Sequence, residues 1–178
     1  MAGTFGDTVE ESAAFVKEMA AVVDAVVIIV SKLATPDEGD DVLLARLQQL
    51  VELTPGVPLG LYECPAPYHR LLSMDALAWI ASSGRFLFLK DTCRNNDQIT
   101  ARLALLKTIK SPFRWFNGNV TTMLHSLQQG ATPLSTMKTS THCNSHVLIC
   151  SPRLIISCAR TYPASIGAEL SAPPNCVR

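Results

Sequence analysis

The chain has 178 residues, of which 48% are hydrophobic and 17% charged, and its formal net charge is zero. This length suits one domain with a real core, and the lack of clustered charge argues against nucleic acid or a membrane surface as a partner. The longest apolar run, residues 20–30, is broken by Asp24 and is shorter than the roughly 20 residues of a membrane span. Met1 to Glu18 show no secretory signal, so we expect a cytoplasmic protein with reduced cysteines.

Up to Gly130 the sequence alternates between helical and strand patterns. Thr8 and Glu11 form a capping box that opens an amphipathic stretch reaching about Val23. The elements predicted after it are a strand at 26–30, a helix at 36–53, a strand at 59–62, a helix at 73–82, a strand at 85–90, a helix at 96–107, a strand at 113–117 and a helix at 120–129. Gly130 suits the C-terminal end of the last helix.

The predicted strands begin roughly every 30 residues, and a helix follows each one, which is the period of a βα unit. Their apolar runs do not alternate with polar residues, so both faces of the sheet are expected to be covered and the strands to be parallel. Periodicity alone leaves two architectures open: part of a (β/α)8 barrel or an open α/β sheet.

The pattern fails after Gly130. Residues 131–178 are rich in proline, serine and threonine, and they contain a single acidic residue. Residues 147–150 and 154–158 are candidates for short strands, but no capped helix is visible. We therefore divide the chain into a barrel-like part, 1–130, and an atypical tail, 131–178, which we expect to be disordered.

The cysteines do not predict a metal site. Four of the six crowd the last part of the chain, from Cys143 to Cys176. Their intervals are much wider than the two to four residues that commonly separate paired zinc ligands. Cys143 and His146 are close together, yet no second pair stands at usable spacing.

Lys90 is the sharpest chemical feature of the sequence. It ends the apolar run that begins at Phe86, and the carboxyl ends of parallel strands are where α/β folds place their active sites. A lysine among apolar walls loses solvation of its ammonium form, and its free amine then becomes a nucleophile for carbonyl groups. The alternative is a lysine that extends to water from the end of a strand.

Tyr62 ends the preceding strand, so it is expected at the same end of the sheet as Lys90. A phenol at that position can relay protons for an amine catalyst. The alternative is a tyrosine with a buried ring and a solvated hydroxyl group.

Together these two strands resemble those of the dihydrodipicolinate synthase and N-acetylneuraminate lyase family. Gly60-Leu61-Tyr62-Glu63-Cys64-Pro65 is similar to the family's Tyr-x-x-Pro strand, and Phe88-Leu89-Lys90-Asp91-Thr92 is similar to its Schiff-base lysine strand, at the right interval. Ala2-Gly3-Thr4-Phe5-Gly6 resembles the turn after the family's third strand, and Phe116-Asn117-Gly118-Asn119 its seventh-strand loop.

The resemblance implies a partial (β/α)8 barrel, from about the third to the seventh unit, with class I aldolase chemistry. Lys90 would form a Schiff base with pyruvate or another 2-oxo acid, Tyr62 would relay protons, and the loop at Gly118 and Asn119 would face the substrate. Because the lysine is itself the catalyst, no metal or organic cofactor is implied. A homo-oligomer is the expected assembly of the folded chain.

The sequence also departs from the family. The first two units are absent, and with them the Gly-Thr-Thr or Gly-Ser-Thr turn that binds the substrate carboxylate. Residues 31–34 lack the second tyrosine of dihydrodipicolinate synthases, and Pro67 replaces an arginine for which Arg70 is a loose substitute. No eighth strand is visible in residues 131–178, which we interpret as an out-of-frame or alternatively spliced end.

These departures support two alternatives. The first is a catalytically inactive, truncated relative that acts by associating with a full-length one. The second is an unrelated open α/β binding domain in which the spacing of Tyr62 and Lys90 is a coincidence. Among the other reactive side chains, His69 is a candidate for a substrate-side role, His125 is expected to be structural, and Cys93 would need positive neighbours such as Arg94 to be reactive.

Overall fold

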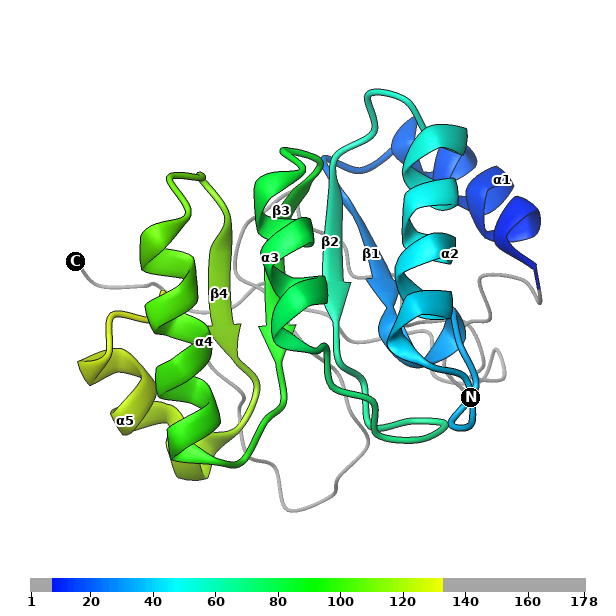
Figure 1. Ribbon diagram of the computed structural model, residues 1–178. Helices are drawn as coiled ribbons and strands as arrows, with labels where there is room; N and C mark the ends of the chain where they lie inside the picture. Colours follow the sequence, from blue (N-terminus) through cyan, green and yellow to red (C-terminus); the bar gives the residue numbers. More distant parts are fainter. Residues whose placement is uncertain (1–7, 133–178) are drawn as a thin grey trace, which may run out of the picture.

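The computed structural model describes residues 8–132, which form a parallel sheet with helices packed against it (Figure 1). The strands are β1 (Val26–Ile29), β2 (Leu59–Tyr62), β3 (Phe86–Asp91) and β4 (Arg114–Asn117). The helices are α1 (Val9–Ala20), α2 (Asp40–Leu53), α3 (Met74–Ser82), α4 (Asn96–Thr108) and α5 (Met123–Gln128), with 3-10 turns η1 (Val30–Lys32) and η2 (Val120–Thr122).

The helix predicted at 36–53 starts later than expected, at Asp40. The residues before it form a turn instead, in which the Thr35 amide donates to the Glu38 carboxylate at 2.7 Å. The helix predicted at 120–129 divides into η2 and α5. There the Asn119 side chain accepts a hydrogen bond from the Thr121 amide at 2.9 Å, which favours a tight first turn.

Side-chain caps begin three of the helices. The capping box expected at α1 is present, since the Glu11 amide donates to Thr8 Oγ1 at 3.2 Å and the Thr8 amide donates to Glu11 Oε2 at 3.4 Å. Ser73 caps α3 and Asn95 caps α4 with side-chain oxygens that accept from backbone amides of the first turn. Each cap satisfies amide groups that the first helical turn leaves without partners.

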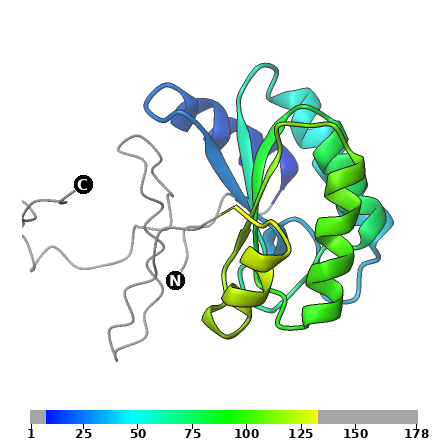
Figure 2. The same cartoon turned by 90° about the vertical axis from the view of Figure 1, so that its left-hand side faces the viewer.

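The strands follow the chain order β1-β2-β3-β4, and all neighbouring pairs are parallel. Figure 2 shows α2, α3 and α4 on the same side of the sheet. A doubly wound sheet reverses its strand order and places helices on both faces, whereas a barrel keeps one direction and one helical layer. The described residues therefore have the architecture of a partial (β/α)8 barrel, as the resemblance implied.

The core lies between the sheet and this helical layer. Its largest fully buried side chains are Ile28, Leu43, Leu47, Leu50, Leu59, Leu61, Leu77, Ile80, Leu89 and Ile99. These residues come from three strands and three helices, so the layer fixes the strands that carry Tyr62 and Lys90. No helix within residues 8–132 is both long and apolar enough to cross a membrane.

Two sequence predictions fall on residues outside 8–132: the turn at 2–6, and all but the first two residues of the tail predicted at 131–178. Packing of the described chain continues past Gly130, because Ala131 is buried and the Thr132 amide donates to the Trp115 carbonyl at 3.1 Å. Thr132 also forms a parallel bridge with Phe116, beside β4.

Candidate functional site

The carboxyl ends of β2 and β3 bring together the two residues that the sequence singled out. Tyr62 and Lys90 occupy paired positions in the register of the two strands. Lys90 Nζ lies 4.0 Å from the centroid of the Tyr62 ring, which is a cation–π distance. Only 3% of Lys90 and 8% of Tyr62 is exposed. The amine thus lies against an aromatic face inside the protein.

The sheet surface below this amine is apolar and tightly packed. Phe88 precedes Lys90 by two residues, so it points to the same face of the sheet. Its ring packs edge-to-face on Phe116, with centroids 5.7 Å apart. A side chain at Gly60 would come within 2.4 Å of the Phe88 ring, so only glycine leaves room for the ring there.

Gly118, one of the predicted substrate-side residues, lies directly beside Lys90. A Cβ atom at Gly118 would stand 3.1 Å from Lys90 Cε and 2.8 Å from the Asp91 carbonyl oxygen. The Gly118 amide donates to that same carbonyl at 2.6 Å. The loop after β4 therefore contacts the lysine through a position where a side chain would not fit.

Asn119, the other predicted substrate-side residue, is engaged within its own loop. Its side-chain oxygen accepts from the amide and the hydroxyl group of Thr121, at 2.9 and 2.8 Å. Its amide donates to Asn117 Oδ1 at 2.7 Å. The side chain of Asn119 thus shapes the loop that holds Gly118.

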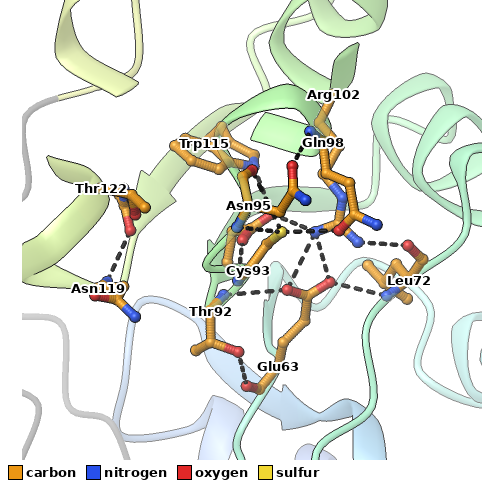
Figure 3. A network of polar contacts seen from close by, with 12 residues as sticks. Glu63, Leu72, Thr92, Cys93, Asn95, Gln98, Arg102, Trp115, Asn119 and Thr122 are labelled. Carbon is orange, nitrogen blue, oxygen red and sulfur yellow. Dashed lines mark hydrogen bonds and ion pairs between the residues drawn. The ribbon is translucent and has the colours of Figure 1, made fainter. Parts of the chain in front are cut away.

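Each of the two site residues is followed by a buried carboxylate. Glu63 follows Tyr62, Asp91 follows Lys90, and both carboxylates are completely buried. Figure 3 shows the Glu63 side chain directed toward Arg102 of α4. Arg102 Nη1 lies 2.9 Å from Glu63 Oε1 and also contacts Asp91 Oδ2. We call Glu63, Asp91 and Arg102 the Arg102 cluster.

Further hydrogen bonds connect the Arg102 cluster to its surroundings. The carboxylate of Glu63 accepts from the amides of Leu72 and Thr92 at 2.8 and 3.1 Å. The carboxylate of Asp91 accepts from the Cys93 amide at 2.6 Å and from Trp115 Nε1 at 3.1 Å. Arg102 also donates to the Leu72 carbonyl. These contacts join β2, β3, β4, α4 and the segment that leads into α3.

Burial first, and the neighbouring Asp91 carboxylate second, raise the pKa of Glu63 against the opposing effect of Arg102, to a net value of about 7. A carboxyl group in such surroundings exchanges a proton near neutral pH, unlike an exposed glutamate. The Glu63 carboxyl group therefore retains its proton to a higher pH than an exposed glutamate does.

Cys93 is not activated by its position. Burial raises the pKa of its thiol, and Sγ lies 3.0 Å from Gln98 Oε1. A reactive cysteine needs the opposite shift, toward the thiolate. Residues 8–132 also contain no cluster of three or more His, Cys, Asp and Glu side chains that could hold a metal ion.

The two histidines and Arg70 occupy different surroundings. His69 Nε2 lies 2.8 Å from Thr92 Oγ1, so this exposed side chain stands near the end of β3. His125 Nε2 lies 2.9 Å from Thr100 Oγ1 and links α5 to α4, away from Lys90. Arg70 donates to the Thr35 carbonyl at 2.7 Å and forms an ion pair with Asp40, which ties the loops after β1 and β2 together.

The sequence prediction did not identify the Arg102 cluster. One signal was available: acidic residues stand directly after Tyr62 and Lys90, inside apolar strand segments, where a buried charge needs a partner. The partner itself could not be found from sequence, because Arg102 lies on a helix with several polar residues and its contacts depend on how α4 packs on the sheet.

No protein-family model matches the sequence, and no curated protein matches it. Solved structures do match the fold. Dihydrodipicolinate synthase from Thermotoga maritima has a TM-score of 0.60 and 18% identity, over 70% of this chain and 42% of that chain. 2-Keto-3-deoxygluconate aldolase from Picrophilus torridus has a TM-score of 0.59 and 15% identity, over 70% of this chain and 44% of that chain.

A prophage protein of the dihydrodipicolinic acid synthase family from E. coli, in complex with pyruvate, has a TM-score of 0.59 and 18% identity, over 71% of this chain and 42% of that chain. These comparisons confirm that the chain has the fold of part of the barrel found in dihydrodipicolinate synthases and related aldolases. It spans about two fifths of the length of the solved structures that it matches.

Proposed function

We propose that this chain carries the amine site of a Schiff-base-forming lyase or aldolase that acts on pyruvate or another 2-oxo acid. The observation that carries the proposal is the position of Lys90, whose amine is buried near the carboxyl end of β3 against the ring of Tyr62. Buried amines at this end of a barrel are suited to attack carbonyl groups. The likeness to a barrel solved with pyruvate supports the choice of substrate class.

The proposed reaction begins with the uncharged amine of Lys90. Its lone pair attacks the ketone carbon of the 2-oxo acid, and the resulting carbinolamine loses water to give an iminium ion. In cleavage, the C4 hydroxyl group loses its proton, the C3–C4 bond breaks to release an aldehyde, and the electron pair of that bond passes to the iminium to give an enamine. Protonation of the enamine at C3 restores an iminium, whose hydrolysis returns the shortened 2-oxo acid and the amine; bond formation follows the same steps in reverse.

In this proposal Tyr62 moves the protons that these steps require. Its ring contacts the Lys90 amine. The Tyr62 side chain therefore does not have to move toward the amine when the substrate binds. Gly118 and Asn119 form the proposed substrate-side loop. Gly118 contributes by leaving space beside Lys90 Cε, and Asn119 by fixing the loop through its contacts with Thr121.

The test is to trap the iminium with sodium cyanoborohydride in the presence of pyruvate and to locate the adduct by peptide mass mapping of the full chain. We expect a reduced pyruvyl adduct on Lys90. Lys90→Arg, which keeps a cation but cannot form the adduct, should remove it, while replacement of the exposed Lys17 by alanine should not. A folded protein without an adduct on Lys90 would contradict the proposal.

A second candidate function is association with a full-length relative without catalysis of its own. The edges of the sheet favour it, because within residues 8–132 β1 pairs only with β2, and the outer side of β4 meets only the bridge at Thr132. Unpaired strand edges promote pairing with another chain. Light scattering after size-exclusion chromatography tests this function; a strictly monomeric chain that forms the Lys90 adduct would exclude it.

A further inference from the structure

The two proposed site residues share an unusual arrangement: each is backed by a buried carboxylate. Successive residues of a strand point to opposite faces of a sheet. Glu63 and Asp91 therefore lie behind Tyr62 and Lys90, under the helices and away from the space where a substrate would bind. They cannot be substrate contacts, so their burial needs another explanation.

One guanidinium group holds both carboxylates. Arg102 Nη1 lies 2.9 and 3.2 Å from the two carboxylate oxygens of Glu63, and the same nitrogen contacts Asp91. The guanidinium group is only 4% exposed. A single rigid side chain thus joins the end of β2 to the end of β3, one residue beyond Tyr62 on β2 and Lys90 on β3.

Stability alone is a weak reason for such a cluster. Removing charged groups from water is costly, and apolar side chains of similar volume often stabilise a protein equally well or better. Apolar packing does not fix the relative orientation of two groups as strictly as hydrogen bonds do. A guanidinium group fixes its partners through hydrogen bonds of defined geometry. The Arg102 cluster therefore suits a place where the relative position of two strand ends matters.

We infer that Arg102 is a positioning residue for the amine site, an inference that rests on the proposed function: by holding Glu63 and Asp91 together, it sets the distance between Lys90 Nζ and the Tyr62 ring. The hydrogen bonds of Arg102 reach Glu63, Asp91 and the Leu72 carbonyl. Its effect passes through the backbone of the two strands.

The electrostatics of the cluster fit this role, because its members act on one another directly. Burial and the adjacent Asp91 carboxylate raise the pKa of Glu63, whereas Arg102 opposes that rise. Thr92 connects the cluster to the loops at the carboxyl ends of the strands. Its amide donates to Glu63, and its hydroxyl group contacts His69. These are the charged and titratable groups that the hydrogen bonds place around Glu63.

A matched control exists at the start of the strand that carries Lys90. Arg85 stands just before β3, at the opposite end of the sheet, and its guanidinium group donates to the carbonyls of Val51, Thr54 and Val57. Arg85→Lys and Arg102→Lys each keep one positive charge and remove one fork of hydrogen bonds. Only Arg102→Lys changes a side chain that contacts the residue next to Lys90.

The experiment measures the reactivity of Lys90 in two ways on the full chain. One is the rate of pyruvate trapping. The other is trace acetylation with acetic anhydride from pH 6 to pH 11, with Lys90 compared with the exposed Lys17 in the same sample. For Arg102→Lys we expect at least tenfold slower trapping and an acetylation profile of Lys90 that approaches that of Lys17. Arg85→Lys should leave both measurements at the wild-type values.

Wild-type trapping and acetylation in folded Arg102→Lys would overturn the inference, and so would equal changes in Arg85→Lys. If Arg102→Lys does not fold, Glu63→Gln replaces it and should slow trapping about threefold or more; an unchanged rate would again overturn the inference. Acetylation needs no substrate, so it tests the positioning role even where wild-type protein forms no pyruvate adduct. In that case only the proposed function fails.

Discussion

An arginine lies at each end of the sheet, and the two arginines bind different kinds of partner. At the amino ends of the strands, Arg85 donates to three neutral carbonyl groups around the last turn of α2. At the carboxyl ends, Arg102 meets two buried carboxylates. Arg85 completes a helix end, which leaves carbonyl groups without partners in any α-helix. Arg102 pairs with the charges of Glu63 and Asp91, and apolar side chains could fill the same space without burying any charge.

The two arginines let effects on stability be distinguished from effects on the proposed amine site, because they act at opposite ends of β3. β3 begins one residue after Arg85 and carries Lys90 near its other end. The contacts of Arg85 are replaceable by water, because the residue is partly exposed. The contacts of Arg102 are buried and directional, and they lie behind the proposed amine site. Substitutions at the two ends should therefore differ in size and in kind.

The largest expected difference in the free energy of unfolding is between two single variants, each of which lacks one of the two guanidinium groups. Arg102→Met leaves two buried carboxylates without a cation and should lower the free energy of unfolding by about 3–5 kcal/mol. Arg85→Met removes hydrogen bonds to partly exposed carbonyls and should cost about 1–2 kcal/mol. Urea unfolding, followed by circular dichroism, measures both values. Equal losses in the two variants would break the distinction between the ends.

A combined variant sharpens the same comparison. Neutralising the carboxylates as well, with Glu63→Gln and Asp91→Asn beside Arg102→Met, removes the charges that Arg102→Met leaves unpaired. We expect the combined variant to be more stable than Arg102→Met alone, although it carries more substitutions. A further loss of stability would show that the hydrogen bonds that the carboxylates accept from backbone amides matter more than their unpaired charge.

The second prediction concerns pH. The pKa of Glu63 is about 7 in the folded protein, against an ordinary value of 4.5. Between these values the native state keeps a proton that the unfolded chain has lost, so stability due to this group falls as the pH rises from 4.5 to 7, by roughly 3 kcal/mol. Glu63→Gln has no such dependence, and its stability relative to wild type should increase across this window.

Urea unfolding of wild type and Glu63→Gln at several values between pH 4.5 and pH 8 measures this difference. Arg85→Lys serves as the control from the other end of the sheet and should keep the wild-type pH dependence. A difference between Glu63→Gln and wild type that stays constant with pH would show that Glu63 titrates as an ordinary glutamate.

The sequence was sufficient for the order of the elements and insufficient for their arrangement. Every predicted strand and helix before Gly130 is present, because strand and helix patterns follow directly from apolar spacing. A barrel and an open sheet share that spacing. What distinguishes them is the sequential strand order with α2, α3 and α4 on one face, which results from crossovers between distant residues.

The site was predictable to the same degree. Tyr62 and Lys90 were expected at one edge because each ends a neighbouring parallel strand, and the register pairs them. Arg102 could not be assigned, since an isolated arginine in a helix is usually exposed and nothing local indicates which strand it meets. The Asn119 side chain accepts from the Thr121 amide, and its contact with a substrate stays a prediction.

The third prediction compares two glycines. A Cβ atom at Gly118 would meet the Asp91 carbonyl oxygen at 2.8 Å and Lys90 Cε at 3.1 Å. Gly118→Ala should therefore shift the loop after β4, cost about 1–3 kcal/mol and slow pyruvate trapping. Gly84 lies at the other end, with φ +69 and open space around it. Gly84→Ala should cost about 1 kcal/mol through backbone strain alone and leave trapping unchanged.

Thermal unfolding and the trapping rate, measured on both alanine variants, separate these effects. Slower trapping in Gly84→Ala as well would show that Lys90 responds to any loss of stability, and the two ends would then be functionally alike. Slower trapping in Gly118→Ala alone would confine the response to the end that carries the amine.

The smallest expected effect tests whether α4 matters through its stability or through Arg102. The Asn95 side chain caps α4 by accepting from the amides of Asp97 and Gln98 at 2.9 and 3.1 Å. Asn95→Ala should cost about 1 kcal/mol, whereas Asn95→Asp keeps the acceptor and adds a charge that the helix N-terminus favours. Trapping should match wild type in both variants, because the contacts of Arg102 lie about two turns farther along the helix. Slower trapping in Asn95→Ala alone would mean that general stability of α4, and not the guanidinium group, places Lys90 against Tyr62.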